Sequence, residues 1–463
     1  MYDFDLLCIG SGPAGQRAAV QAAKLGYRVA VVEKRYIVGG ICVDSGTIPS
    51  KTFREAVLFF ASLVGRFDWR HAAWEETRPT VEQLLARVGA VMRRETEVIE
   101  RQLRRNGITL LWGEASFKDP HAIVVESERG WRTVTAAHIL IAVGTRPAPP
   151  PGMQADGDVI ITSDGIMQLK RLPRTMVVVG GGIIGVEYAS MFASLGVQVT
   201  LIDKRSRVLE FLDWEIVDEL IHQMRDWNVT FRFGEAVEHM EIADGSPRRA
   251  TLFLESGKLI TSDLVLFSAG RLGATERLNL DVAGLTADER GRLRVDGQFR
   301  TEVPHIFAAG DVIGFPSLAA TSSEQGRLAA CHAFGIPAGD MPQHFPIGIY
   351  SIPEISMVGA SEHELTESRI PYETGVARYR EIARGQILGD DSGLFKMLFL
   401  RDTGQLLGVH AIGTGATELI HIGQAVLALG GGLDYFLQTV FNYPTLAECY
   451  KVAALNAANK FSR

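Results

Sequence analysis

Apolar and polar positions follow the same order in two separate parts of the chain: an apolar strand, a glycine-rich turn, a helix and a second apolar strand. The first copy begins with the apolar run 6–9 and ends with an apolar run that closes at Glu33. The second copy begins with the run 176–179 and ends at Asp203. This internal repeat predicts an α/β fold with two Rossmann-like units, each able to bind a dinucleotide.

The glycines of both turns follow the spacing G-x-G-x-x-G. In this motif the first glycine makes a tight turn, the second lets backbone approach a pyrophosphate, and the third allows close packing of helix and strand. Glu33 and Asp203 each lie 23 residues after the first glycine of their copy, where a carboxylate can accept hydrogen bonds from ribose hydroxyls. A solvated strand end is the alternative for both acids. The glycines are Gly10, Gly12 and Gly15 in the first copy and Gly180, Gly182 and Gly185 in the second.

The remaining sequence predicts a long helix, two crossover segments and a separate C-terminal unit. Apolar spacing predicts a helix from Thr80 to about Arg105. The segments 139–147 and 264–273 are strand and loop crossovers that bracket the second repeat. After residue 342 the pattern changes to short alternating strands followed by helices, which indicates an α+β unit. We therefore expect three domains: residues 1–151 together with 272–342, residues 152–271, and residues 343–463.

Composition excludes several classes of function. With 463 residues, of which 46% are hydrophobic and 22% charged, the chain is expected to form several cores as an ordinary globular protein. Its 47 basic and 54 acidic residues leave a net charge of −7, so no basic field is available to hold nucleic acid or anionic lipid. We also expect no membrane association, because no stretch reaches the roughly 18 apolar residues that a span requires.

The cysteines and histidines point away from disulfides and metals. Only four cysteines occur, too few and too scattered for a secreted disulfide framework, and no basic and apolar leader opens the chain. We therefore expect a cytoplasmic location. The eleven histidines show no H-E-x-x-H spacing and the cysteines no C-x-x-C, so no metal site is expected.

Two further segments carry a family resemblance. The loop 39–51 reads Gly-Gly-Ile-Cys42-Val-Asp-Ser-Gly-Thr47-Ile-Pro-Ser-Lys51, and the segment 306–311 reads Ile-Phe-Ala-Ala-Gly-Asp311. With the two glycine motifs, they resemble the pyridine nucleotide-disulfide oxidoreductases over essentially the whole chain. The resemblance implies FAD bound non-covalently by the first unit, one per subunit, and a nicotinamide nucleotide bound by the second. It also implies that the third domain is a dimerisation domain and that the chain forms a homodimer.

The same resemblance assigns further residues to the two nucleotides. Asp311 would hold the ribityl chain of FAD, and Glu33 and Asp203 would hold the adenosine riboses. The cofactor-binding set beyond these acids and the six motif glycines consists of Gly40, Cys42, Lys51, Gly144, Arg205, Arg207 and Gly270.

Two departures from the family pattern change the expected reaction. Members that reduce disulfides carry a second cysteine where this chain has Thr47, and a hydroxyl cannot form a disulfide. The family's His-Pro-Thr is replaced by Tyr443-Pro-Thr, although the acid that orients the base is retained as Glu448. A phenol with a pKa near 10 is a poor proton carrier at neutral pH. In both respects the chain is similar to the FAD-containing, Si-specific transhydrogenase branch, which implies hydride transfer between NADPH and NAD⁺ through FAD.

The resemblance also assigns roles to individual side chains. Lys51 and Glu187 would form an ion pair beside flavin N5, although each could also be an ordinary residue on a helix surface. Cys42 is either redox-active or a small buried residue near the flavin, and Thr47 fills the space of the missing thiol. Tyr443 and Glu448 would come from the partner subunit, where Tyr443 either covers the flavin or packs the interface.

The segment 203–207, Asp-Lys-Arg-Ser-Arg, bears on nucleotide choice. Asp203 favours the free 2′-hydroxyl of NAD, whereas Lys204, Arg205 or Arg207 could pair with the 2′-phosphate of NADP. Use of both nucleotides is our expectation, and use of NAD alone is the alternative. Two other functions stay open: an NAD(P)H:quinone or diaphorase-type reductase with the same flavin site, and a flavin-bound subunit without activity.

Overall fold

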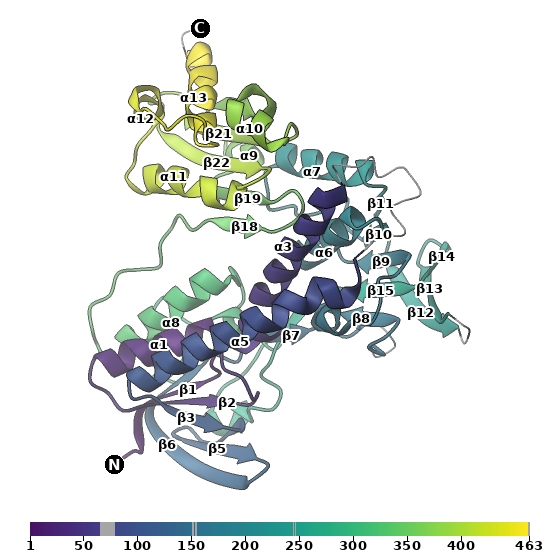
Figure 1. The fold of residues 1–463 in the computed structure, drawn as a ribbon. Coiled ribbons are helices and arrows are strands. Elements are labelled where there is room, and N and C mark those ends of the chain that lie inside the picture. Colours follow the sequence, from purple (N-terminus) through teal and green to yellow (C-terminus); the bar gives the residue numbers. More distant parts are fainter. Residues whose placement is uncertain (65–78, 151, 153–154, 244, 246, 462–463) are drawn as a thin grey trace. The chain divides into compact units, whose positions relative to one another are not determined.

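The computed structural model describes residues 1–64, 79–150, 152, 155–243, 245 and 247–461, and these divide into two compact units (Figure 1). The first unit consists of residues 1–149, 162–171 and 270–341, and the second of residues 150–161, 172–269 and 342–463. The order of helices and strands confirms the expected α/β class. Residue 151, the expected domain boundary, lies outside the described residues, and the division into three domains stays a prediction.

The first unit is built on one sheet with the strand order β3-β2-β1-β6-β5-β4, to which β17 adds by pairing with β6. β1 runs parallel to both β2 and β6, so that Cys8 is level with Val31 on one side and Leu140 on the other. The first half of β6 pairs antiparallel with β5 and continues the sheet. The strands are β1 (Phe4–Ile9), β2 (Val29–Glu33), β3 (Thr109–Trp112), β4 (Glu114–Asp119), β5 (Ala122–Ser127), β6 (Gly130–Ile141) and β17 (Ile306–Ala308).

Both faces of this sheet are buried, as expected for parallel strands between helices. Leu6 and Cys8 belong to the core that contains α1 (Pro13–Lys24) and α8 (Ala319–Ala333), whereas Leu7 and Ile9 belong to a second core. The helices α1 and α8 lie side by side (Figure 1). Gly326 makes this approach possible, since an added Cβ there would lie 2.1 Å from the Ala14 carbonyl oxygen.

The long helix expected between the two repeats is confirmed as α5 (Val81–Arg105). Thr80 caps it by accepting a hydrogen bond from the backbone of Gln83, whose side chain bonds back to the Thr80 N–H. Asn106 ends the helix, and the buried face carries apolar residues at the predicted spacing. The sequence thus specifies this helix through its caps and its apolar stripe.

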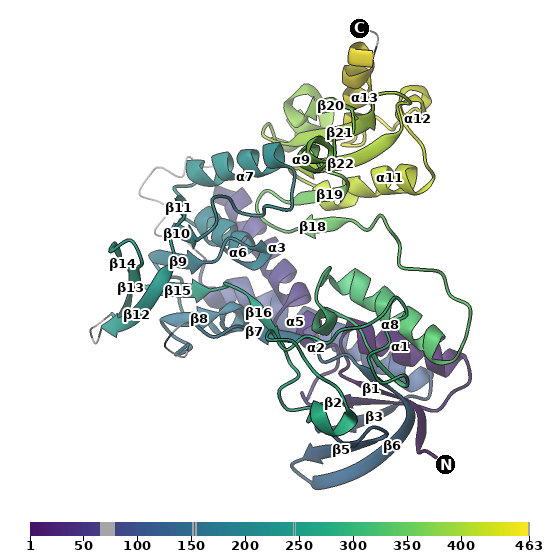
Figure 2. The same cartoon turned by 180° about the vertical axis from the view of Figure 1, so that it is seen from behind.

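Residues 172–269 of the second unit repeat the nucleotide-binding arrangement, and with β8, which precedes them in the chain, they form a sheet of order β11-β10-β9-β15-β8 (Figure 2). Helix α6 (Ile183–Ser194) follows the second glycine turn, and α7 (Trp214–Asp226) follows the segment that contains Arg205 and Arg207. A small antiparallel sheet of β12, β13 and β14 adds to this region. The strands are β8 (Ile160–Thr162), β9 (Thr175–Val179), β10 (Gln198–Asp203), β11 (Thr230–Phe233), β12 (Val237–Ala243), β13 (Arg249–Leu254), β14 (Leu259–Ser262) and β15 (Leu264–Phe267).

Residues 342–463 of the second unit form an antiparallel sheet followed by helices, in agreement with the α+β pattern. The sheet order is β18-β19-β22-β21-β20, and helices α11 and α13 pack on it. The elements are β18 (Ile347–Ile349), β19 (Ile355–Gly359), α9 (Glu362–Glu367), β20 (Tyr372–Arg378), α10 (Ala383–Leu388), β21 (Leu394–Leu400), β22 (Leu406–Ile412), α11 (Ala416–Ala428), α12 (Leu433–Gln438) and α13 (Glu448–Phe461).

The first unit also contains the short helix α2 (Gly40–Asp44), the longer helix α3 (Thr47–Val64), and the paired strands β7 (Thr145–Pro147) and β16 (Arg271–Gly273). Within the described ranges, no helix combines the length and the apolar character needed to cross a lipid bilayer.

Candidate functional site

The first glycine turn borders a cavity of about 590 Å³ that lies entirely within the first unit. The end of β1, the end of β2 and the loop that contains Cys42 and Thr47 all reach it. Most of the expected flavin-binding residues therefore line one space. They are Gly10, Gly12, Glu33, Gly40, Cys42, Gly144 and Asp311.

The three motif glycines have the same structural roles in both repeats. Gly10 and Gly180 have φ angles of +104° and +110°, a left-handed conformation that favours glycine. A Cβ added at Gly15 would lie 1.9 Å from the Gly10 carbonyl oxygen, and Gly185 repeats this contact with Gly180 at 1.9 Å. The middle glycines, Gly12 and Gly182, have open space at the Cβ position. These turns thus pack tightly against their own strands and leave an open edge above the start of a helix.

Glu33 organises the first glycine turn from the end of β2. It is only 5% exposed, so the alternative of a solvated strand end is wrong for this acid. Its Oε2 accepts hydrogen bonds from the Ser11 hydroxyl at 2.6 Å and the Ser11 N–H at 3.1 Å, and its Oε1 accepts one from the Arg35 N–H at 2.9 Å. The Ser11 hydroxyl in turn accepts from the Gly39 N–H at 3.0 Å. Ser11, which was not predicted as a site residue, therefore joins the turn, the acid and the following loop.

Cys42 and Thr47 are neighbours at the cavity. Cys42 lies in α2, Thr47 begins α3, and both line the cavity. Burial raises the pKa of the Cys42 thiol above its ordinary value, and the Thr47 hydroxyl only partly offsets this effect. The thiol is therefore protonated at neutral pH, which makes it a poor nucleophile.

Asp311 is a largely buried carboxyl group that lines the same cavity. Burial raises its pKa, an effect that the Arg271 charge and hydrogen bonds from Thr145 and Ser322 oppose. Arg271 is itself fixed, because its Nε donates to the Thr145 hydroxyl at 2.8 Å and its Nη2 to the Thr145 carbonyl oxygen at 3.0 Å. Arg271 and Thr145 were missed in the sequence, where only their neighbours Gly270 and Gly144 suggested a site. Gly270 itself does not line the cavity.

Asp203 ends β10 in the second repeat and is 7% exposed, so the alternative of a solvated strand end is wrong here as well. Its carboxylate accepts from the Gly181 N–H at 2.6 Å and from the Arg205 N–H at 2.8 Å. The Arg205 guanidinium donates to both carboxylate oxygens, at 2.9 and 2.7 Å. Burial opposes ionisation of Asp203, but these donors outweigh it and hold its pKa below the ordinary value.

Arg207 and Lys204 occupy different environments from Arg205. The Arg207 guanidinium is ion-paired with Asp218 and lies over the Trp214 ring, with its Cζ 5.3 Å from the ring centroid. Lys204 is exposed. The structure therefore brings Arg205 against the acid and Arg207 against helix α7.

Lys51 and Glu187 lie in different compact units, and their expected ion pair stays a prediction. Glu187 is buried at 3% exposure on α6 and accepts a hydrogen bond from the Tyr350 N–H at 2.8 Å. An ordinary helix-surface position is therefore wrong for Glu187. Lys51 is half-buried on α3.

Tyr443 and Glu448 lie near the C-terminal end of the second unit. The Tyr443 side chain is 73% exposed in the single chain. Glu448 begins α13, and its Oε2 is buried without a hydrogen-bond partner among the described residues. Neither the covering role nor the packing role of Tyr443 is tested by this arrangement.

Comparison with known families and sequences matches almost the whole chain to one family of oxidoreductases. The family model described as pyridine nucleotide-disulphide oxidoreductase matches residues 4–326, and the dimerisation domain of the same family matches residues 345–454. A protein from Mycobacterium tuberculosis strain H37Ra, named soluble pyridine nucleotide transhydrogenase, is 53% identical over 99% of this chain and 98% of its own length. A protein of the same name from Photobacterium profundum is 43% identical over 99% of this chain and 98% of its own length.

Solved structures with the same fold include two at 26% sequence identity. LpdA from Mycobacterium tuberculosis matches with a TM-score of 0.88 over 97% of this chain and 99% of its own. The HOCl-induced flavoprotein disulfide reductase RclA from Escherichia coli matches with a TM-score of 0.87 over the same shares.

Proposed function

We propose, from the premise that the chain belongs to the pyridine nucleotide-disulphide oxidoreductase family, that it is a transhydrogenase which moves hydride between NADPH and NAD⁺ without a redox-active disulfide. Relatives at 43% and 53% identity that carry this name support the reaction. The observation that carries the finer proposal is the Cys42–Thr47 pair. The chain has a hydroxyl beside the remaining thiol, in the same cavity, at the place where disulfide-reducing members have a second cysteine.

The residues around the cavity fit FAD. Gly12 leaves open space at the start of α1, where unpaired backbone N–H groups can receive a pyrophosphate. Asp311 offers a buried acceptor for the hydroxyls of a ribityl chain, and Glu33 offers one for an adenosine ribose. When bound there, non-covalently and one per chain, FAD would supply the group that accepts and returns hydride.

The Asp203–Arg205 pair supports the use of two nucleotides. For NAD, the Asp203 carboxylate is the acceptor for the 2′-hydroxyl. For NADP, the adjacent guanidinium groups offset the repulsion between this carboxylate and a 2′-phosphate. We propose Arg205 and Arg207 as the residues that offset it, with the glycine turn 180–185 under the pyrophosphate.

We propose further that Lys51 and Glu187 form an ion pair at the flavin, where the ammonium stabilises negative charge during hydride transfer. The burial of Glu187 supports this role, because a buried carboxylate needs a cationic partner or strong donors. Cys42 would be a structural neighbour of the flavin rather than a redox group.

We propose a homodimer formed through residues 343–463, and the cytoplasm as its compartment; two features support the dimer. The matched dimerisation domain exposes large apolar side chains, among them Leu429, Val440 and Tyr443 at 87%, 93% and 73% exposure. The unpartnered Glu448 Oε2 is consistent with a partner group from a second chain.

The test is an anaerobic two-step titration of the purified yellow protein. NADPH is added while the flavin absorbance near its visible maximum is followed, and NAD⁺ is added after the absorbance has fallen. We expect a prompt fall and a prompt recovery. A fall without recovery would overturn the transhydrogenase proposal, and rapid turnover of an added quinone in that sample would establish the reductase alternative. An absorbance that neither NADPH nor NADH changes would leave only the inactive-subunit alternative.

A further inference from the structure

The Arg207 guanidinium is held on one face of helix α7. It lies over the ring of Trp214, with Cζ 5.3 Å from the centroid, and it is ion-paired with Asp218, one helical turn further along. The Asp218 side chain is 61% exposed, whereas the Asp203 side chain that holds Arg205 is only 6% exposed. Exchanging an ion pair whose carboxylate is exposed costs little free energy, whereas breaking a pair with a buried carboxylate costs much more. Arg207 is therefore the arginine that can more readily exchange its carboxylate partner for an incoming phosphate.

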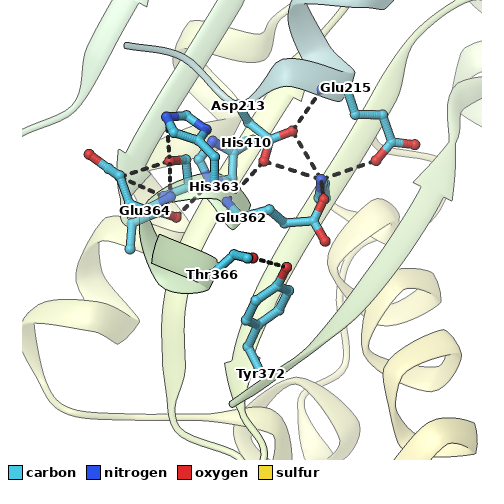
Figure 3. A network of polar contacts seen from close by, with 11 residues as sticks. Asp213, Glu215, Glu362, His363, Glu364, Thr366, Tyr372 and His410 are labelled. Atoms are coloured by element: carbon cyan, nitrogen blue, oxygen red, sulfur yellow. Dashed lines mark hydrogen bonds and ion pairs between the residues drawn. The ribbon is translucent and has the colours of Figure 1, made fainter. Parts of the chain in front are cut away.

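The first turn of α7 is anchored by residues 342–463 of the same unit (Figure 3). Asp213, the N-cap of α7, accepts from the Lys396 ammonium at 2.9 and 3.1 Å and from the Glu362 N–H at 3.2 Å. Lys396 is fully buried and also contacts the carboxylates of Glu215 and Glu362. The three acids thus converge on one ammonium group, and the start of the helix cannot shift without breaking these contacts.

Trp214 is fixed from the same side. Its ring stacks on His363, with centroids 5.0 Å apart and an interplanar angle of 10°. His363 is in turn hydrogen-bonded through Nε2 to the Ser361 hydroxyl, the N-cap of α9. Trp214 is therefore a ring with a fixed position that contacts Arg207.

We propose that Trp214 is a specificity-determining positioning residue, which holds the Arg207 guanidinium ready for the 2′-phosphate of NADP. This inference rests on the proposed use of both nucleotides. A guanidinium that is already oriented loses less conformational freedom when phosphate binds, so the benefit falls on NADP(H) and not on NAD(H).

The test compares nucleotide binding and kinetics of the FAD-loaded, full-length protein with those of Trp214→Leu, Trp214→Phe and Arg207→Ala. Dissociation constants for NADP⁺ and NAD⁺ are measured by isothermal titration calorimetry, and KM values for NADPH and NADH by steady-state kinetics. A cation–π contact at a partly exposed site is worth about a two- to five-fold change in affinity. We expect Trp214→Leu to weaken NADP⁺ binding by that factor and to leave NAD⁺ binding unchanged, whereas Trp214→Phe retains most of the NADP⁺ affinity.

The double variant separates positioning from a general structural role. Once Arg207 is alanine, Trp214→Leu should cost nothing further toward NADP⁺, because the contact it removes is already absent. Equal weakening of both nucleotides by Trp214→Leu, an additive loss in the double variant, or no change at all would overturn the proposal. The thermal unfolding midpoint of Trp214→Leu is measured alongside, and wild-type-like unfolding is expected.

The outcomes also separate this inference from the proposed reaction. Recovery of the flavin absorbance with NAD⁺, together with equal effects of Trp214→Leu on both nucleotides, would retain transhydrogenation and overturn the Trp214 role. A selective effect of Trp214→Leu on NADP⁺, in a protein that does not pass hydride to NAD⁺, would retain the Trp214 role and overturn transhydrogenation.

Discussion

Arg205 covers both carboxylate oxygens of Asp203, so a nucleotide that approaches β10 meets an ion pair instead of a bare acid. The backbone N–H of Gly181 donates to the same carboxylate, which ties the pair to the glycine turn. Under the proposed use of both nucleotides, the same loop would receive either a 2′-hydroxyl or a 2′-phosphate.

The first prediction concerns this pair. Removing the guanidinium with Arg205→Ala leaves a buried carboxylate facing the 2′-phosphate, and we expect the KM for NADPH to rise about ten-fold or more while that for NADH changes little. Arg205→Ala combined with Arg207→Ala should widen the difference further. Steady-state kinetics with each nucleotide measure the two KM values. The matched control is Arg401→Ala, at an exposed arginine in the turn that follows β21. Equal losses with both nucleotides would contradict the prediction.

The second prediction is that Cys42→Ser retains most of the turnover. The thiol is protonated at neutral pH because burial raises its pKa, and a serine side chain occupies nearly the same space beside Thr47. We expect kcat for NADPH to NAD⁺ transfer within about three-fold of wild type, a change below ~1 kcal/mol in barrier height. A loss of a hundred-fold would show that Cys42 takes part in the chemistry.

The third prediction is that the protein does not oxidise dihydrolipoamide. Thr47 cannot form a disulfide with Cys42, and the Tyr443 phenol does not replace an imidazole base. Because two functions are missing, Thr47→Cys alone should not create the activity, and Thr47→Cys with Tyr443→His is the smallest change that addresses both. The measurement is NADH formation from dihydrolipoamide and NAD⁺. Enzyme-like rates in the wild type would refute the argument from both residues.

The fourth prediction concerns stability at Lys396. Lys396→Met removes the cation on which Asp213, Glu215 and Glu362 converge and leaves the 1% exposed Asp213 carboxylate buried without its partner. Breaking a buried pair from one side costs about 3–5 kcal/mol of unfolding free energy. Chemical denaturation should register this loss, and Lys396→Met with Asp213→Asn should recover part of it. A Lys396→Met protein as stable as wild type would contradict the assignment.

The fifth prediction is a pH dependence at His410. The side chain is 1% exposed, and burial lowers its pKa below the ordinary value of about 6.5. Its neutral form is favoured in the folded state, so its contribution to stability is complete above about pH 6.5 and is lost as the pH falls through the lower folded pKa. Wild type should therefore lose more unfolding free energy than His410→Gln between about pH 7 and pH 5. Parallel pH profiles for the two proteins would argue against this role.

Local rules were sufficient for much of the fold. Both glycine turns and their closing acids lie where the spacing predicted. Gly10 and Gly180 adopt a positive φ, and Gly15 and Gly185 each leave no room for a Cβ beside the carbonyl oxygen of the glycine five positions earlier. The helix from Val81 to Arg105 was likewise predictable from its caps and apolar stripe. Such features depend on neighbours in the sequence, and a pattern can therefore express them.

Contacts between distant segments could not be predicted in this way. The Asp213 and Lys396 side chains meet across 183 positions of sequence, and Arg271 reaches Thr145 across 126. In the sequence, Asp213 predicts only the cap of a helix, and Lys396 is only a charged residue that interrupts an otherwise apolar strand. The folded chain is needed to show that these residues satisfy one another.

The bonds between residues 172–269 and 342–463 also constrain motion. Besides the Lys396 contacts, the Ile352 N–H donates to the Ser190 hydroxyl at 3.0 Å, and the Tyr350 N–H donates to Glu187. Helices α6 and α7 are thus both fastened to the same C-terminal segments. We expect these two regions, which belong to one compact unit, to move as a single body when a nucleotide enters or leaves.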